Sequence, residues 1–236
     1  MDVAKEYITG GQCTEDCFAV IASEQTAGRG TQGRVWSSTS GNLFLTFAVK
    51  MAAIRTPLQL TPLRVGVLLR NTVASFTANP GDIELKWPND VLIGKKKVSG
   101  ILIEVQDDYA LVGVGCNIGS APTVESTGPD CGRPATCLLD HVAVDARDTA
   151  ATDLIQTVGT DLCRSIYAWV ETSGGDSARA IVSDFSQAMD TTKQRMRPES
   201  GGIAEVITPV RVKPDGTLEV KTGTGASKIL VSEYLF

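Results

Sequence analysis

The sequence predicts an α+β protein with one larger domain and a small all-β segment near its C-terminal end. Three observations predict this class. Short β-type runs follow one another between residues 83 and 117, two long segments with helical spacing flank them, and a hairpin signal is built on Asp215-Gly216. A chain of 236 residues is long enough for one substantial core, or for a core with a small satellite domain.

The first fifty residues predict a short helix and two strands around an irregular loop. The helix covers about Asp2–Thr9 and is ended by Gly10-Gly11. The compact apolar run Phe18–Glu24 predicts a buried strand, and Leu43–Lys50 predicts a second strand. The segment 26–42 between them is so rich in Gly, Ser, Thr and Arg that it cannot be regular throughout.

The middle of the chain predicts one helix followed by a meander of strands. The helix covers about Thr61–Thr77, with Thr61 as the candidate N-cap and Pro62 at the first helical position. The strands, with turns at Gly94-Lys95 and Gln106–Asp108, are expected at Ile83–Lys86, Val91–Ile93, Val98–Val105 and Tyr109–Asn117.

Two further helices are expected after the loop-like segment 119–136. The first covers about Asp148–Val170 and carries an apolar stripe that is typical of a core-facing helix, and the second covers Ser177–Met189.

The last forty residues change in character. The hairpin 210–222 and the strand Ile229–Leu235 predict a small all-β domain. We therefore expect two domains, 1–190 and 191–236, joined near residues 190–200.

Composition and charge exclude several classes of protein. The formal net charge is −5, with 27 acidic and 22 basic side chains, which disfavours a general nucleic-acid binder. The sequence has no apolar run of the roughly 18 residues that cross a bilayer. The opening MDVAKEYITGG is too polar for a signal peptide and too acidic for a transit peptide. We expect a cytoplasmic protein without nucleic-acid or membrane partners; a mitochondrial location stays open.

Cysteine and histidine usage argues against metal and triad chemistry. The six cysteines lie at positions 13, 17, 116, 131, 137 and 163. A zinc finger needs two closely spaced ligand pairs, and the sequence has no second cysteine pair with that spacing besides Cys13 and Cys17. The single histidine, His141, lies in the ordinary stretch LLDHVAV. Hydrolytic triad chemistry is therefore disfavoured, and metal ligands stay unknown.

The segment Gly28–Gly33 matches G-x-G-x-x-G letter for letter. A dinucleotide-binding turn would open a helix there and place an acid about 20 residues later, yet loop and strand follow and position 53 is alanine. What remains is a glycine-rich loop with two arginines, Arg29 and Arg34, and with Trp36 behind them. Such a loop suits an anion, although a basic surface loop is the alternative. Trp36 either covers an adenine or simply packs.

The segment Lys86–Glu104 is a denser signal. It places four lysines, Trp87-Pro88, an Asn-Asp pair and a glycine in a strand–turn–strand. Alternation puts Lys95 and Lys97 on one face of the strand and Lys96 on the other. Two alternatives stay open: Lys95–Lys97 is only a solvated hairpin tip, or Lys86 and Asp90 form an ordinary surface pair. Trp87 argues against a solvent turn, because exposing tryptophan is costly.

The run Val112–Asn117 has alternate glycines at the end of a strand. They leave room for another group to lie against the backbone, and tight sheet packing is the alternative.

These segments together resemble the biotin–protein ligase family. Its pattern joins a Gln-x-x-Gly-Arg-Gly loop ending Arg-x-Trp, Ser-x-x-Gly-Asn-Leu, Lys-Trp-Pro-Asn-Asp, Lys-x-x-Gly-Ile-Leu-x-Glu and Gly-x-Gly-x-Asn. The matching segments here are Gln25–Gly30, Arg34–Trp36, Ser38–Leu43, Lys86–Asp90, Lys97–Glu104 and Gly113–Asn117. Several spaced motifs in order, over about residues 1–118, are far more specific than any one of them.

The resemblance implies a fold and a reaction. The fold is a mixed β-sheet flanked by helices, followed by a small SH3-like barrel. The reaction joins biotin to ATP as biotinyl-5'-AMP and then transfers biotin to a lysine of a biotin carboxyl carrier domain, with Mg²⁺. The partner is the carrier domain of a biotin-dependent carboxylase, and a homodimer is open. We expect no repressor-type DNA-binding domain of the kind that some members have, so DNA binding is not implied.

The resemblance also implies roles for single residues. The catalytic residues are Lys97, Arg29 and Asp90, with Lys97 between the biotin carboxylate and the α-phosphate. Asp90 orients either the incoming lysine or a magnesium ion. Biotin is bound by Gln25, Gly28, Arg29, Lys97, Gly100 and Gly115. ATP is bound by Arg34, Trp36, Lys86, Asn89 and Asn117.

The chain departs from the family pattern at two places. A Ser-Thr pair that bonds the biotin ring usually precedes the first helix, whereas this sequence starts at Met1 in the helix; either the chain is truncated or that contact is lost. Thr31 stands where the family has the second arginine of Gly-Arg-Gly-Arg, which helps relatives to retain the adenylate.

Two rival functions stay open. A lipoate–protein ligase shares the implied fold and chemistry, and a non-catalytic domain would bind biotin or carrier proteins without releasing pyrophosphate from ATP.

Overall fold

In the described part of the chain, six strands form the main sheet, in the order β1-β2-β6-β5-β4-β3. The computed structural model describes residues 1–11, 13–124, 133–142, 151–172, 176–196 and 205–232. The strands are β1 (Cys17–Ala22), β2 (Leu43–Lys50), β3 (Ile83–Lys86), β4 (Asp90–Ile93), β5 (Lys96–Gln106) and β6 (Tyr109–Cys116). Every strand pair in this sheet is antiparallel, so the expected mixed sheet is wrong. Tight turns at Gly94-Lys95 and Asp107, with positive φ, reverse the chain between neighbouring strands.

The strand β1 was expected to be buried but lies at the edge of the sheet. It pairs with β2 alone, and its Ile21 is 39% exposed. The apolar run Phe18–Glu24 indicated a strand but not its place, because a short apolar run does not tell an edge strand from a central one.

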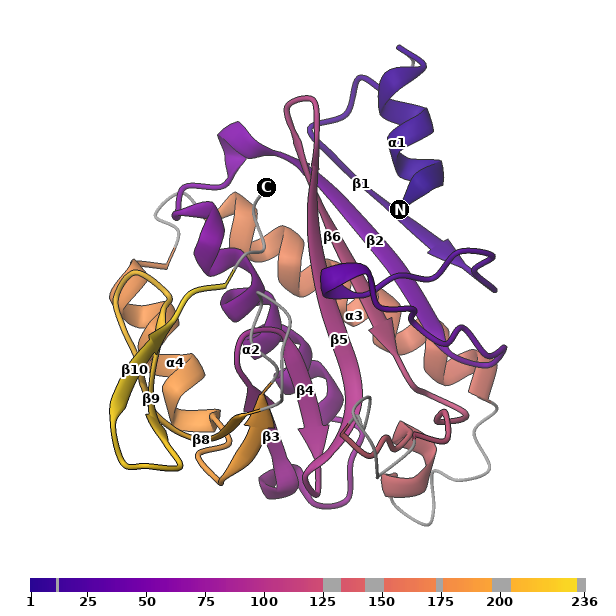
Figure 1. Ribbon diagram of the computed structural model, residues 1–236. Coiled ribbons are helices and arrows are strands. Elements are labelled where there is room, and N and C mark those ends of the chain that lie inside the picture. The colour runs from indigo at the N-terminus through magenta and orange to yellow at the C-terminus, as the bar shows by residue number, and fades with distance from the viewer. Residues whose placement is uncertain (12, 125–132, 143–150, 173–175, 197–204, 233–236) are drawn as a thin grey trace.

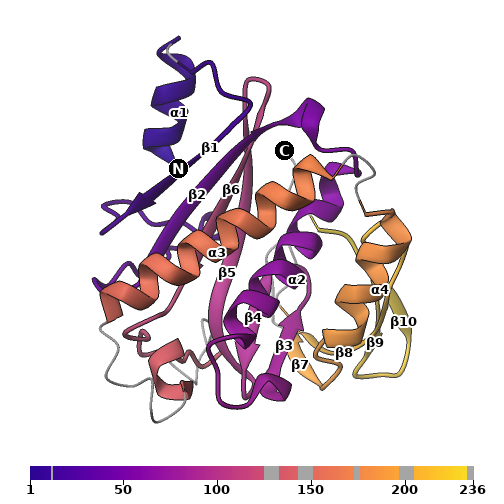
Figure 2. The ribbon, with the colours of Figure 1, turned by 180° about the vertical axis from the view of Figure 1, so that it is seen from behind.

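Helices cover both faces of the sheet. They are α1 (Asp2–Thr9), α2 (Thr61–Ala74), α3 (Ala151–Glu171) and α4 (Ala178–Ala188). Seen from behind, α2 and α3 cross one face of the sheet (Figure 2). On the opposite face, α1 buries Ala4 and Ile8 against Ala48, Tyr109 and Leu111.

The helix bounds differ from the expected ones mainly at the ends. Thr61 is the first helical residue rather than the N-cap, because a short 3₁₀ turn, Leu58–Leu60, leads directly into α2. The helix α4 has Ser177 as its N-cap, whose hydroxyl accepts from the backbone N–H of Ala180 at 3.1 Å. The expected start of α3 at Asp148 lies outside the described residues.

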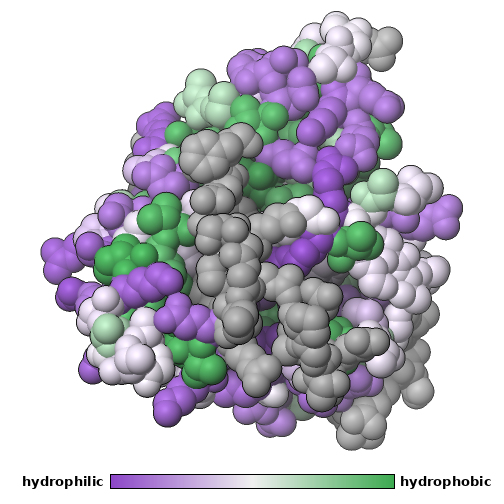
Figure 3. Space-filling view, viewed as in Figure 1, coloured by the Kyte–Doolittle hydropathy of each residue, from purple (hydrophilic) through white to green (hydrophobic). Residues whose placement is uncertain are grey.

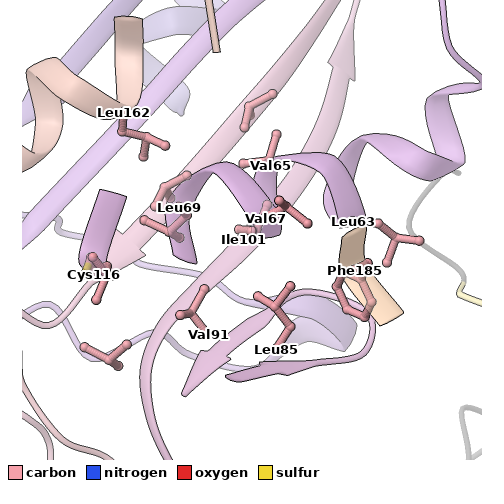
Figure 4. Packing of buried hydrophobic residues seen from close by; sticks show 14 of the residues in the cluster. Leu63, Val65, Val67, Leu69, Leu85, Val91, Ile101, Cys116, Leu162 and Phe185 are labelled. Carbon is pink, nitrogen blue, oxygen red and sulfur yellow. The ribbon is translucent and has the colours of Figure 1, made fainter. Parts of the chain in front are cut away.

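The core lies between the sheet and the helices α2, α3 and α4. In Figure 4, leucines and valines of α2 face Leu85, Val91 and Ile101 of the strands, with Leu162 and Phe185 close by. The apolar stripe on α3 is buried as expected, at Leu154, Val158, Leu162, Ile166 and Trp169.

A second antiparallel sheet forms the C-terminal part of the chain. Its strands, in the order β10-β9-β8-β7, are β7 (Gln194–Met196), β8 (Glu205–Val212), β9 (Leu218–Thr222) and β10 (Ser227–Leu230). The expected turn at Asp215-Gly216 is confirmed, with Gly216 at a φ of 85°. Figure 3 shows hydrophobic side chains gathered over this sheet.

The two sheets are joined through a buried tryptophan. Trp87 is 3% exposed, and its indole N–H donates to the carbonyl of Gly216 at 3.0 Å. Trp87 therefore belongs to the contact between the sheets. In the described part of the chain, no helix is long and apolar enough to cross a membrane.

Candidate functional site

One face of the central strands forms the floor of a pocket. Gly100 of β5 lies opposite Gly115 of β6, and Gly113 lies between Leu102 of β5 and Thr46 of β2. Because side chains alternate along a strand, these residues share one face. The loop between β1 and β2 passes in front of β5 and β6 (Figure 1) and encloses a cavity of about 140 Å³. The predicted site residues that line it are Gln25, Arg29, Arg34, Trp36, Asn89, Lys97, Gly100 and Gly115.

The glycines of the floor are required for this shape. A Cβ atom on Gly115 would lie 2.5 Å from Cε2 of Trp36, and one on Gly100 would lie 3.0 Å from its Cζ3. A Cβ atom on Gly113 would lie 2.8 Å from Sδ of Met1. The alternate glycines therefore let other groups contact the backbone of the sheet, as one of the two interpretations expected.

Trp36 lies inside the pocket. Its half-buried indole covers Gly100 and Gly115, and Nζ of Lys97 lies 5.2 Å from the ring centroid, a cation–π contact. The indole N–H is buried and has no hydrogen-bond partner among the described residues. A buried donor without a partner is costly, so this group is available for a polar atom of a ligand.

The glycine-rich loop folds back on itself. The N–H of Trp36 donates to the carbonyl of Gly28 at 3.0 Å, and the N–H of Gly30 donates to that of Arg34 at 2.7 Å. The Arg34 side chain donates to the carbonyl and hydroxyl of Thr31, at 3.1 and 2.7 Å. Gly28 does not line the cavity, but a Cβ there would collide with the hydroxyl of Ser38.

Arg29 reaches across the pocket to two carboxylates. Its Nε lies 2.7 Å from Oε1 of Glu104, and its Nη2 lies 2.7 Å from Oδ1 of Asp2. Lys5 also pairs with Glu104, at 2.7 Å. The hydrogen bonds from Arg29 and Lys5 outweigh partial burial and hold the pKa of Glu104 below its usual value. The guanidinium expected to meet the biotin carboxylate is therefore held by carboxylates of the protein itself.

A buried carboxylate holds two lysines beside the pocket. Oδ1 of Asp90 lies 2.6 Å from Nζ of Lys97, and Oδ2 lies 3.6 Å from Nζ of Lys86. Burial opposes ionisation of Asp90, but the charges of Lys97 and Lys86 outweigh it and lower its pKa. Burial lowers the pKa of Lys86. Asp90 is 7% exposed, so the alternative of an ordinary surface pair is wrong.

The neighbouring lysines have different environments. Lys95 and Lys96 are both exposed, but Nζ of Lys95 lies 2.6 Å from Oε1 of Glu84 and 3.1 Å from Oδ1 of Asp190. The alternative of a merely solvated hairpin tip is therefore wrong for Lys95 and Lys97.

The two predicted asparagines make contacts within the protein. The amide of Asn89 donates to the carbonyl of Ile101 at 2.8 Å, which fastens the Trp-Pro turn to β5. The amide of Asn117 donates to the carbonyl of Thr136 at 3.1 Å, and Asn117 does not line the cavity. Lys86 and Asp90 do not line it either and adjoin it through Lys97.

Comparison with known proteins assigns the chain to a family. A model of the Biotin/lipoate A/B protein ligase family matches residues 8–119. The chain is 33% identical over 198 residues to the biotin--[acetyl-CoA-carboxylase] ligase of Mycobacterium tuberculosis, covering 81% of this chain and 68% of that protein. The chain belongs to the biotin–protein ligase family.

Solved structures of biotin–protein ligases have the same fold. The Leishmania major ligase in complex with biotin aligns with a TM-score of 0.68 and 29% identity, covering 98% of this chain and 94% of that one. Its complex with biotinyl-5-AMP has a TM-score of 0.65, at 28% identity and the same coverage. The Aquifex aeolicus ligase in complex with biotin and ATP has a TM-score of 0.66 and 26% identity, covering 92% and 86%.

Sequence reasoning missed part of the pocket wall of this ligase. Met1, Thr46, Leu102 and Gly113 also line the cavity. The signal for Gly113 was present, because it lies two residues before Gly115 on the same strand and so shares its face. Leu102 had the same signal, because it lies two residues after Gly100 on β5. Thr46 and Met1 depend on strand register and on where α1 packs, for which no local signal exists.

The described part of the ligase contains no cluster of side chains that would form a metal centre. Within the residues that the structure describes, no three His, Cys, Asp or Glu side chains are placed together to hold an ion. Both carboxylate oxygens of Asp90 already face lysines.

Proposed function

We propose that this ligase forms biotinyl-5'-AMP from biotin and ATP and transfers the biotinyl group to a lysine of a biotin carboxyl carrier domain. The carboxylate of biotin attacks the α-phosphate of ATP, and pyrophosphate leaves. The amine of the carrier lysine then attacks the acyl carbon, and AMP leaves. Neither step needs a nucleophile from the protein, so its task is positioning and charge stabilisation.

The observation that supports this most directly is the ammonium group of Lys97 at the edge of a glycine-floored pocket. Lys97 and Lys86 share the single carboxylate of Asp90, so one positive charge of the three groups stays uncompensated. Two anions, a carboxylate and a phosphate, must meet in the first step, and an uncompensated cation lowers their repulsion.

We assign the remaining contacts from the pocket and the family resemblance; Gly28, Lys86 and Asn117, which do not line the cavity, are assigned from the resemblance alone. Gln25, Gly28, Arg29, Lys97, Gly100 and Gly115 contact biotin. Arg34, Trp36, Lys86, Asn89 and Asn117 hold the nucleotide. In this proposal Asp90 orients Lys97 and Lys86, and Arg29 exchanges one of its carboxylate partners for the carboxylate of biotin.

We propose Mg²⁺ as part of the ATP substrate rather than as a resident ion. The donor set around Asp90 does not fit a protein-held cation, because Lys97 and Lys86 occupy its oxygens. An ion that arrives with ATP is held mainly by phosphate oxygens, as Mg²⁺ commonly is.

The architecture and the setting complete the proposal. We place the domain boundary at residue 190, with strands β7–β10 as an SH3-like barrel. The carrier domain of a biotin-dependent carboxylase is the partner, and the cytoplasm is the compartment. Sedimentation equilibrium tests whether the ligase forms a homodimer.

The experiment that tests the function is biotin-dependent exchange of labelled pyrophosphate into ATP. The first step is reversible and needs no carrier, so exchange is expected with biotin and not with lipoate. Exchange with lipoate alone would favour a lipoate–protein ligase. Biotin binding without any exchange would identify a non-catalytic binding domain.

A further inference from the structure

The backbone of Lys97 is held by a segment far from it in the sequence. Its N–H donates to the carbonyl of Pro134 at 2.8 Å, and its carbonyl accepts from the N–H of Thr136 at 2.9 Å, forming a parallel bridge with Ala135. The register between β4 and β5 shifts at this point. The position of Lys97 therefore depends on the segment 133–136, defined here as the lysine clamp.

The lysine clamp is anchored by the side chain of its first residue. Nη1 of Arg133 lies 3.2 Å from Oδ2 of Asp190 and donates to the carbonyl of Lys95 at 3.1 Å. Nη2 of Arg133 donates to Oε1 of Gln194 at 3.1 Å. The guanidinium of Arg133 therefore connects the lysine clamp to three other parts of the chain. These are the turn before Lys97, Asp190 after α4, and Gln194, the first residue of β7.

The acceptor of this anchor is itself fixed. The Asp190 side chain is fully buried, and its backbone N–H donates to the carbonyl of Leu85 at 2.7 Å. Its Oδ1 accepts from the hydroxyl of Thr192 at 2.6 Å and faces Lys95 at 3.1 Å. Arg133 does not line the cavity, and its guanidinium is already engaged by Asp190, Gln194 and the carbonyl of Lys95.

We propose that Arg133 is a positioning residue for the adenylation step, acting through the lysine clamp on Lys97. The inference depends on the proposed function, in which Lys97 meets the reacting carboxylate and phosphate. A lysine side chain has many rotamers, so its reactive atom is placed only if its backbone is fixed. Releasing Arg133 lets the clamp shift, and a displacement of about 1 Å at the reacting atoms can cost on the order of 100-fold in rate.

The test is the kinetics of pyrophosphate exchange in Arg133→Ala, Arg133→Lys and the wild-type protein. We expect Arg133→Ala to lower kcat about tenfold or more, with KM for biotin and ATP within roughly threefold, because positioning contributes mainly to the transition state. Arg133→Lys reaches Asp190 without the forked contacts, so its kcat should lie between the two.

Arg64→Ala is the matched control. Arg64 is buried to the same degree, with 17% side-chain exposure against 16% for Arg133, and it pairs with Asp176 and Asp184 away from Lys97. This variant should lose thermal stability while keeping kcat within twofold of the wild type.

A double mutant separates positioning from a general structural role. On the Lys97→Ala background, Arg133→Ala should cause no further loss of kcat, because the residue through which it acts is gone. Equal losses on both backgrounds, or a kcat of Arg133→Ala within twofold of the wild type, would overturn the inference. A wild-type protein without biotin-dependent exchange would instead reject the proposed function itself.

Discussion

The ammonium group of Lys97 lies 2.6 Å from the carboxylate of Asp90, which is buried and faces Lys86 as well. One carboxylate can compensate only one of the two ammonium charges. The three groups together therefore keep a net positive charge beside the pocket.

Lys97→Ala should lower kcat for adenylate formation by roughly 100-fold or more, because two anionic groups would then meet without the nearest counter-charge. Pyrophosphate exchange at saturating and limiting biotin measures kcat and KM separately. Lys96→Ala is the control, since Lys96 is the exposed neighbour in the same strand. If kcat is unchanged and KM for biotin is raised, Lys97 contributes to binding of the substrate and not to stabilisation of the transition state.

Biotin should change the intrinsic tryptophan fluorescence through Trp36 alone. Trp87 and Trp169 are 3% and 5% exposed and belong to the core, whereas the indole of Trp36 covers the pocket floor. A titration of the wild type should show a saturable change that Trp36→Phe abolishes. If the change persists in Trp36→Phe, the ligand acts on another tryptophan and the assignment of this pocket is contradicted.

Glu104→Gln should destabilise the protein at neutral pH by about 1–2 kcal/mol, because Arg29 and Lys5 lose a charged acceptor. The pKa of Glu104 is lowered in the folded protein, so its stabilising contribution is present above the unfolded pKa, near 4.3, and is lost as pH falls through the folded value.

Denaturant unfolding of wild type and Glu104→Gln between pH 7 and pH 3 measures this. The difference should be constant down to about pH 5.5 and shrink below about pH 4.3. The exposed Glu6 on α1 supplies the control variant, Glu6→Gln. A difference that does not change with pH would show that the ionised Glu104 contributes nothing.

Thr31→Arg should reduce the labelling of bystander proteins while leaving carrier labelling intact. The hydroxyl of Thr31 accepts from Arg34 at 2.7 Å, so this residue draws Arg34 into the loop instead of adding a cation. A hydrogen bond to a charged group contributes about 1.5–3 kcal/mol. A ligase that lacks the hydrogen bond of the family's arginine at this position would release the adenylate faster by roughly one to two powers of ten.

Blotting biotin in a mixed lysate measures this leakage. Thr31→Ser, which keeps the hydroxyl for Arg34, is the control. A wild type that labels only its carrier, unchanged by Thr31→Arg, would show that the adenylate is retained by other contacts.

Local sequence signals were sufficient for much of the site. The alternate glycines of the run Val112–Asn117 were expected to leave room against the backbone, and they do so because glycine has no Cβ between the sheet and its neighbour. Contacts between distant segments had no such signal. The bonds from Lys97 to Pro134 and from Arg29 to Glu104 depend on how loops cross the sheet.

The fold shows the same division. The strands Leu43–Lys50 and Ile83–Lys86 have the expected bounds, because their apolar patterns and flanking turns are local. The place of β2 beside β6, and with it the edge position of β1, depends on pairing between segments that are distant in sequence. For Asp148 and the segment 125–132, which lie outside the described residues, the expectations stay predictions.

The hydrogen bond from Trp87 to Gly216 connects the five residues Lys86–Asp90, which adjoin the pocket, to the C-terminal sheet. Asn89 lines the pocket and Lys86 and Asp90 adjoin it through Lys97, while the indole of Trp87 contacts the C-terminal sheet. Ligand binding and the contact with the C-terminal sheet are then linked. A ligand in the pocket that stabilises the turn Lys86–Asp90 also stabilises the contact of that turn with the C-terminal sheet. Amide hydrogens of the β8–β9 hairpin should therefore exchange more slowly when the distant pocket is occupied, although no ligand atom touches them.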